Sequence, residues 1–495
     1  MKKVTLLNII TALILQIMVV VSGFVIPKII LTYFGSGING LVSSINQFLS
    51  YITLVEGGIT GVIMANLYKP LIEEDTVELS SVMVASKKFY EKIGLIFIAY
   101  TILLAVVYPI LWGRDYSFIF VFFLVLILSI TLMVQYMFSL TLKSLLSADK
   151  KLYIVNFTQI IIVVLNVILA YVSVKIYPSI HILKLISGVL FVLQPLIFGQ
   201  YVKRNYDIDW KAIPNNDLIK ERWNGFAINI AACIHNSTDI VVLTIYTSLQ
   251  IVSVYSVYVL VTNGLRGLLN SIFSGINPTL GQAYATGDKE KLNRMMDIYE
   301  YITFVLVFYF FTIAALLITP FVLLYTKGIA DADYDQRVFG FLIVFSEALY
   351  LIKSPHLSLA YVANKFKEIT MPAYIEAAIN IVLSVVFVGK YGLPGVAIGT
   401  ICGMIYRLTF HVYFTSKLIM GRSQRIFYKK LFAFSLVTII GIIICQGLVP
   451  FTQLTIESWI LHAVIYCLVF GGLYLVLSIF TFRDELRFFM GYLKR

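Results

Sequence analysis

The chain has 495 residues, of which 60% are hydrophobic, 15% aromatic and 13% charged, and its formal net charge is +12 at pH 7. Soluble globular domains are only about 45–50% apolar. The composition therefore excludes a soluble globule and predicts an integral membrane protein with many spans. In such a protein, cytoplasmic loops rich in Lys and Arg explain the positive charge, so we expect no nucleic-acid partner.

Apolar stretches follow one another along the whole chain, and about fourteen are long enough to cross roughly 30 Å of hydrocarbon as helices. They centre near residues 20, 53, 102, 129, 163, 191, 234, 263, 312, 350, 379, 407, 439 and 470. The first follows Met1-Lys2-Lys3 without a small-residue cleavage site, which predicts an uncleaved span. The connections are too short to fold as a soluble catalytic domain, so we expect no enzyme.

The loop charges predict the topology. With the N-terminus inside, most of the 38 Lys and Arg residues fall in loops on the cytoplasmic side. The pattern predicts fourteen spans in the cell membrane with both termini cytoplasmic.

Two pairs of short segments in the chain have weakly similar sequences. Ala148-Asp149-Lys150-Lys151 is echoed by Ala363-Asn364-Lys365-Phe366, and Phe89–Ile93 is echoed by Ile298–Ile302. These pairs indicate two units of six spans each. Because each unit crosses the membrane an even number of times, both have the same orientation, and an axis along the membrane normal would relate them. A cleft would then lie between the two units. The predicted domains are an N-terminal six-helix lobe at 1–205, a C-terminal six-helix lobe at 206–425, and two additional helices with a cytoplasmic tail at 426–495.

Basic residues inside the apolar stretches are the main functional signal. They are Lys28, Lys184, Arg266, Lys353 and Arg407. A cation at mid-bilayer costs roughly 2.5–3.5 kcal/mol, so it is usually kept for a purpose. Lys28 and Lys184 lie near span ends, where their long stems can reach the headgroups. We expect the other three, which lie deeper, to line a central cavity and to bind an anionic group.

Uncharged polar residues recur at helical spacing in several spans and suggest the walls of that cavity. Candidate substrate contacts are Asn46, Ser50, Asn236, Asn263 and Asn270. Such side chains also bridge helices without any ligand, and this alternative stays open. Gly395, Gly399 and Gly403 have the spacing that allows two helices to approach closely, which indicates packing.

Acidic residues within the spans are candidates for coupling transport to H⁺ or Na⁺, together with one histidine. They are Glu56, Asp239, Glu347, Glu376 and His411. The acids could instead pair with the buried bases inside the bundle, and both interpretations stay open. No His, Cys, Asp and Glu residues cluster at metal-ligand spacing, so we expect neither a metal nor another cofactor.

Short motifs distributed over nearly the whole chain add a resemblance. They include Pro27-Lys28-Ile29-Ile30, Glu56-Gly57-Gly58-Ile59, Leu67-Tyr68-Lys69-Pro70-Leu71, Ala148-Asp149-Lys150-Lys151 and Tyr391-Gly392-Leu393-Pro394-Gly395. In these motifs the chain resembles the Wzx-type polysaccharide flippases of the multidrug/oligosaccharidyl-lipid/polysaccharide (MOP) exporter superfamily. The resemblance implies a V-shaped pair of six-helix lobes. It also implies ion-driven, alternating-access transport of undecaprenyl-pyrophosphate-linked oligosaccharides from the inner to the outer leaflet for surface polysaccharide synthesis.

Two other functions compete with this one. A multidrug or cation antiporter of the same fold would favour an acid-lined cavity, whereas the candidates here mix arginine, lysine and asparagine. A membrane polysaccharide polymerase would place catalytic acids or arginines on sizeable outer loops, and the predicted outer loops are short.

Overall fold

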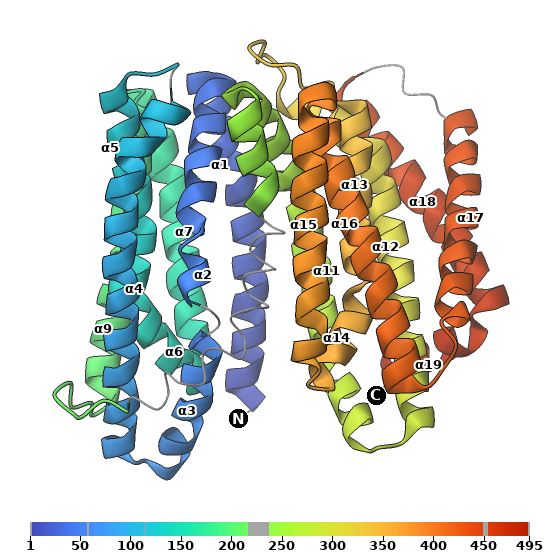
Figure 1. The fold of residues 1–495 in the computed structure, drawn as a ribbon, viewed down its shortest axis with the longest axis horizontal. Helices are drawn as coiled ribbons and strands as arrows, with labels where there is room; N and C mark the ends of the chain where they lie inside the picture. Colours follow the sequence, from blue (N-terminus) through green and yellow to red (C-terminus); the bar gives the residue numbers. More distant parts are fainter. Residues whose placement is uncertain (1, 57–58, 114, 216–236, 449–453, 494–495) are drawn as a thin grey trace. The chain divides into compact units, whose positions relative to one another are not determined.

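The computed structural model describes residues 2–56, 59–113, 115–215, 237–448 and 454–493. Over these residues the chain forms helices joined by short connections, without a β-strand (Figure 1). Helices satisfy all their backbone hydrogen bonds internally, as a segment in hydrocarbon must. The chain divides into two compact units, Met1–Ser253 and Val254–Arg495, and each is described by itself.

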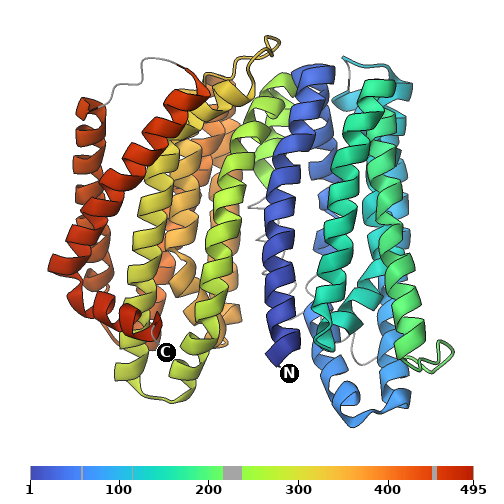
Figure 2. The ribbon, with the colours of Figure 1, turned by 180° about the vertical axis from the view of Figure 1, so that it is seen from behind.

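The helices of the first unit follow the apolar stretches closely. They are α1 (Lys2–Ser50), α2 (Thr53–Glu56), α3 (Ile59–Glu73), α4 (Thr76–Leu111), α5 (Phe118–Val134), the π-helix η1 (Gln135–Ser139), α6 (Leu140–Ala148), α7 (Leu152–Ile176), α8 (Ile180–Phe191) and α9 (Leu193–Asn205). A short helix, Ser237–Tyr246, follows. α1 packs along α7, and α5 packs against α4 and α8 (Figure 2).

The second unit has a similar series of helices. They are α11 (Leu249–Ala285), which begins in the first unit, α12 (Lys289–Tyr325), α13 (Arg337–Ile352), α14 (Ser354–Val362), α15 (Phe366–Tyr391), α16 (Leu393–Phe414), the π-helix η3 (Thr415–Met420), α17 (Arg425–Leu448), α18 (Ile456–Thr481) and α19 (Arg483–Leu493). α15 packs on α16, and α13 packs on both α12 and α16.

The predicted all-α membrane fold is confirmed. Twelve helices in the described ranges are long and apolar enough to cross a membrane. Two of the fourteen expected spans are not among them. α1 joins two helices at Gly35, where φ is 79°, so the second expected span corresponds to Ser36–Ser50 with α2 and α3. The span expected near residue 234 lies mostly outside the described residues.

One helix connection in each unit is built in the same way: the turn before α4 in the first unit and the turn before α12 in the second. Asp75 caps α4 by accepting hydrogen bonds from two backbone amides of its first turn, and Asp288 caps α12 likewise. The residue before each aspartate, Glu74 or Gly287, has a positive φ. The interval between the two aspartates is close to that between the sequence echoes, so the two hairpins are equivalent landmarks of the two units.

A second pair of landmarks lies at the turn that the sequence echo indicated. Lys150 has φ 58° and Asn364 has φ 56°, and the amide of the next residue bonds five residues back in both turns. This is the left-handed end of a helix, which Asn adopts more easily than Lys. The turn conformation therefore makes Lys150 equivalent to Asn364. The sequence similarity alone would align Lys150 with Lys365, one residue later.

Buried ion pairs attach α17 to α12. Lys430 Nζ lies 2.7 Å from Asp297 Oδ1 and 2.9 Å from Glu300 Oε2, and Arg422 bonds to both carboxylates. His356 Nε2 lies 3.3 Å from Glu300 Oε1. Glu300 is 1% exposed and Lys430 4%. Two acids thus meet two bases, and this cluster, Asp297, Glu300, Arg422 and Lys430, holds α17 and the connection before it against α12.

Replacing Lys430 by Met is expected to destabilise the protein by about 3–5 kcal/mol, because removing one member of a buried ion pair leaves its partner without countercharge. Thermal unfolding in detergent micelles measures the effect. Lys429→Met at the exposed neighbouring position is the matched control and should change stability little. Equal melting temperatures for the two variants would show that the cluster contributes no stability.

Candidate functional site

Charged side chains from four helices gather inside the second unit. α11 supplies Arg266, α13 supplies Glu347 and Tyr350, α15 supplies Glu376, and α16 supplies Arg407 and His411, while Lys353 ends α13. The sequence predicted every charged member of this group, and the structure brings them together. We refer to these seven residues as the cationic cluster.

Close approach of α15 and α16 creates its deepest part. A Cβ on Gly399 would lie 2.3 Å from Ser384 Oγ, so this position requires glycine, and one on Gly403 would lie 3.1 Å from the carbonyl oxygen of Glu376, a tight contact. This contact sets Arg407 opposite Glu376, to which Arg407 Nη1 donates a hydrogen bond. Glu376 is 2% exposed and Arg407 7%, so the pair belongs to the interior of the unit.

Arg407 also determines the proton position on His411. Its Nε donates to His411 Nε2 at 2.9 Å, one helical turn away. Since a guanidinium cannot accept, Nε2 must carry the lone pair and the proton must reside on Nδ1. His411 is fully buried, and its Nδ1 has no hydrogen-bond partner among the described residues. The histidine is therefore neutral and presents an N–H donor.

Arg266 has a looser environment. Its Nη1 lies 3.4 Å from both carboxylate oxygens of Glu347, at the long limit of a hydrogen bond, and the two side chains are 22% and 13% exposed. The guanidinium also lies 5.5 Å from the centre of the Tyr350 ring. A longer contact between more exposed side chains is easier to exchange for another anion than the Arg407 pair.

Lys353 is the least neutralised cation of the cluster. It is 3% exposed, and its Nζ lies 4.2 Å from the centre of the Tyr350 ring and 3.9 Å from Met404 Sδ. Within the described ranges no carboxylate comes within ion-pair distance of this ammonium. The cluster holds three cations against two carboxylates, so one positive charge is in excess.

The uncharged candidates occupy more open positions. Asn46, Asn263 and Asn270 are exposed, although each lies on an apolar helix. Ser50 is half-buried and bonds within its own helix to Gln47. Asp239 is 5% exposed in the helix Ser237–Tyr246. The candidate Asn236 lies outside the described residues.

The first unit contains a polar site built around Glu56. This residue ends the four-residue helix α2 and accepts hydrogen bonds from Thr60 and, at 3.1 Å, from Tyr136 in η1. Thr60 is also hydrogen-bonded to Tyr90, at 2.7 Å. The site therefore lies where α2 ends and where α5 gives way to a π-helix, an irregularity that is frequent at functional sites.

The two sites correspond in the two units. Tyr136 and Tyr350 have the same separation along the chain as Lys150 and Asn364, the equivalent turn residues. Tyr136 faces the carboxylate of Glu56, whereas the Tyr350 ring lies beside Arg266 and Lys353. Next to its tyrosine the first unit holds an acid, whereas the second unit holds bases together with Glu347. The sequence did not single out either tyrosine, since 32 tyrosines carry no distinguishing pattern.

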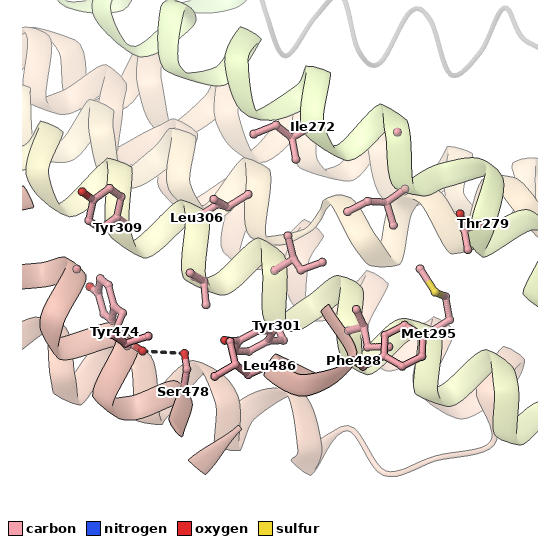
Figure 3. Close-up of a pocket in the computed structure, with 17 residues that line it drawn as sticks. Ile272, Thr279, Met295, Tyr301, Leu306, Tyr309, Tyr474, Ser478, Leu486 and Phe488 are labelled. Atoms are coloured by element: carbon pink, nitrogen blue, oxygen red, sulfur yellow. Dashed lines mark hydrogen bonds between the residues drawn. The ribbon is translucent and has the colours of Figure 1, made fainter. Parts of the chain in front are cut away.

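An apolar groove of about 600 Å³ lies on the second unit, between α11 and α12 on one side and α18 and α19 on the other (Figure 3). Ile272, Leu306 and Leu486 are among the apolar side chains that line it, with Tyr301 and Tyr309. Ser478, one of the few polar residues there, donates to the carbonyl oxygen of Tyr474 at 2.7 Å. Sequence reasoning missed this groove because it depends on how the last helices pack.

Within the described ranges, no three His, Cys, Asp or Glu side chains are grouped as the ligands of a metal ion would be. The charges of the cationic cluster can instead hold an anion, and Glu56 with its hydroxyl partners can hold a proton or a small cation.

Solved structures with a similar fold are transporters. The lipid II flippase MurJ in an inward closed conformation superposes with a TM-score of 0.72 at 19% identity, over 97% of this chain and 100% of that chain. An inward-facing multidrug resistance transporter of the MATE family, from the MOP superfamily, gives 0.64 at 13% identity, over 83% and 98%. MATE in the bent conformation gives 0.55 at 15% identity, over 89% and 99%. The chain therefore has the fold of these membrane transporters.

Neither a protein-family model nor a curated protein matches the sequence. With so few identical residues the structural likeness establishes the fold alone, and the function must be argued from the residues of this chain.

Replacing Arg407 by Leu is expected to destabilise the protein by about 3–5 kcal/mol, because Glu376 would remain buried without its countercharge. Replacing both residues by Leu should restore most of that loss, since apolar residues often substitute for a buried ion pair without penalty. Equilibrium unfolding in mixed micelles gives the free energies. A double variant as unstable as the single one would contradict a simple pair, and exposed Arg425→Leu is the control for loss of an arginine.

Proposed function

We propose that the protein is a flippase of the Wzx type, which moves undecaprenyl-pyrophosphate-linked oligosaccharides from the inner to the outer leaflet of the cell membrane. The observation that supports this most directly is the excess positive charge of the cationic cluster, buried within a unit built of membrane-spanning helices. A buried positive charge without a counterion costs free energy, and binding of an anion would offset that cost. The product is surface polysaccharide, and both chain ends lie on the cytoplasmic side in this proposal.

The pyrophosphate is the group that matches this excess. It carries several negative charges and many acceptor oxygens, so it can use an ammonium and a guanidinium together. Lys353 supplies the ammonium, and Arg266 supplies the guanidinium by exchanging its 3.4 Å contact with Glu347 for a phosphate. Arg407 has a different part, because its buried pair with Glu376 sets the geometry of α15 and α16.

The sugars need amide and hydroxyl partners facing water. Asn46, Asn263 and Asn270 are exposed at points where an amide facing lipid would lack hydrogen-bond partners. We assign contacts with the oligosaccharide to these three residues, each within its own unit. The polyprenyl chain is apolar and fits the groove between α11, α12, α18 and α19, which is long, tyrosine-edged and nearly free of polar groups.

Coupling to an ion gradient is assigned to the first unit. Glu56 has hydroxyl donors from Thr60 and Tyr136, and no arginine or lysine forms an ion pair with it in the described part of the chain. A carboxylate in this setting can take up a proton or a small cation during each cycle. Asp239 is a further candidate because it is buried in the same unit.

A multidrug or cation antiporter is the second candidate function. The Glu56 site favours it, since an acid with hydroxyl partners also suits an organic cation. The cationic cluster disfavours it, because its excess positive charge would repel such a substrate. Transport assays with cationic dyes separate the two functions, since only an antiporter would extrude them against a gradient.

Replacing Lys353 by Met is expected to abolish transport while leaving stability nearly unchanged, because the ammonium has no carboxylate partner among the described residues. Arg at this position should retain part of the activity. In cells, polyprenyl-linked glycan should accumulate in the inner leaflet, as measured by enzymatic labelling of inside-out vesicles. Normal surface polysaccharide in Lys353→Met would remove the lysine from the site, and build-up in the outer leaflet would indicate a polymerase. Exposed Lys367→Met is the control.

Replacing Glu56 by Gln is expected to uncouple the protein, since an amide keeps the size of the side chain and one accepting oxygen but cannot take up a proton. Glycan transport into vesicles should then no longer respond to an imposed pH or Na⁺ gradient. Glu73→Gln on the exposed part of α3 should leave the response intact. If Glu56→Gln responded like the unmodified protein, the coupling group would have to be sought elsewhere, at Asp239 first.

A further inference from the structure

The first unit contains a groove that the transport proposal does not use. Its volume is about 780 Å³. Lys87 of α4 lies on one side, and Leu196, Val202 and Lys203 of α9 lie on the other. η1 and α6 form the floor between them, and the segment from Tyr206 to Trp210 lies across one end. All of these elements belong to one unit.

The lining of this groove is divided into an apolar length and a basic end. Met137, Phe138 and Leu142 make the floor. Lys87 and Lys203 are exposed at the end where α4 begins and α9 terminates. Loop charges predict that this end faces the cytoplasm. A surface with an apolar stripe and cations at headgroup height matches a lipid that carries a negative head.

Hydrogen bonds hold the segment that closes the groove. The amide of Asp209 donates to Ser80 Oγ at 3.0 Å, and Ser81 Oγ donates to the carbonyl oxygen of Ile213 at 2.7 Å. Tyr206 is bonded to Asp149 and Lys151 at the turn after α6. The segment is therefore fixed against α4 and α6, and the groove exists before any ligand arrives.

The charges around the basic end leave it positive. Lys87 lies 3.8 Å from Glu91, a half-exposed contact that contributes little, and 5.2 Å from the centre of the Trp210 ring. Lys203 has no carboxylate within ion-pair distance among the described residues. Asp207 is the acid that lines the groove, so two cations face one carboxylate. Trp210, at 41% exposure, has the amphipathic ring that prefers the membrane interface.

We propose that this groove binds one anionic phospholipid of the inner leaflet, with its phosphate between Lys87 and Lys203 and an acyl chain along the floor. The site is independent of the transport path, so its occupancy is measured as binding and not as flipping. The proposal gives a role to Lys87, Lys203 and the apolar groove, which take no part in the cationic cluster.

Native mass spectrometry of the full-length protein released from detergent tests the site. The protein is titrated with phosphatidylglycerol, phosphatidylcholine, undecaprenyl phosphate or inorganic phosphate. We expect one phosphatidylglycerol to bind about tenfold more tightly than phosphatidylcholine, as a basic site near the surface requires. Displacement of phosphatidylglycerol by inorganic phosphate, or tighter binding of undecaprenyl phosphate, would overturn the assignment to a phospholipid.

Matched variants separate this site from general surface charge. Lys87→Gln with Lys203→Gln should lose the preference for phosphatidylglycerol. Lys88→Gln with Arg204→Gln removes the same charge from the adjacent positions, which do not line the groove, and should keep it. Equal loss in both double variants would overturn the proposal.

A steric pair tests the apolar floor. A Cβ on Gly199 would meet only Leu142 Cδ1, at 3.9 Å, so Gly199→Ala should bind normally. Gly199→Phe fills the groove and should weaken binding at least tenfold. Unchanged binding by a monodisperse Gly199→Phe protein would place the lipid elsewhere and overturn the proposal.

Discussion

Hydrocarbon offers no partner to a charge or to a peptide group, and every polar feature of this protein is organised by that constraint. Helices satisfy the backbone, and polar side chains must find one another or water. Arg407 meets Glu376 because glycines on α16 let α15 come close enough for the two side chains to touch. Asp297 and Glu300 are matched in the same way by Arg422 and Lys430. Only after these pairs are accounted for does Lys353 emerge as a charge that the described residues leave uncompensated.

The sequence predicted the elements of the fold and the charged members of the cationic cluster, but not which of them form pairs. Apolar length identifies spans reliably, and Gly395, Gly399 and Gly403 marked the close helix pair. The sequence gives the approximate depth and the charge of a residue, and these are alike for Arg266, Lys353 and Arg407. Whether a cation is paired depends on which helix faces it, which spacing along one chain does not encode. Arg266 and Arg407 each lie beside a carboxylate, as the alternative of pairing inside the bundle proposed. Lys353 has no such partner among the described residues and carries the excess charge.

Irregular segments were harder still to predict. The π-helix that turns Tyr136 toward Glu56 leaves no mark in hydropathy, and the groove between α4 and α9 depends on the segment that folds back across its end. The similarity between the two units could be seen in the sequence. The exact alignment, however, follows from two turns in which Lys150 and Asn364 have positive φ. With that alignment, Tyr136 contacts the acid Glu56, whereas Tyr350 lies beside Arg266 and Lys353.

The ion pairs between α12 and α17 also bear on how the chain enters the membrane. Glu300 leaves the ribosome 130 residues before Lys430, its partner in the finished protein. Until Arg422 and Lys430 have been synthesised, Asp297 and Glu300 lack the two bases that neutralise them in the finished protein. A chain that ended before α17 would leave both carboxylates without these partners. The neutralisation of α12 therefore depends on a segment that is synthesised much later.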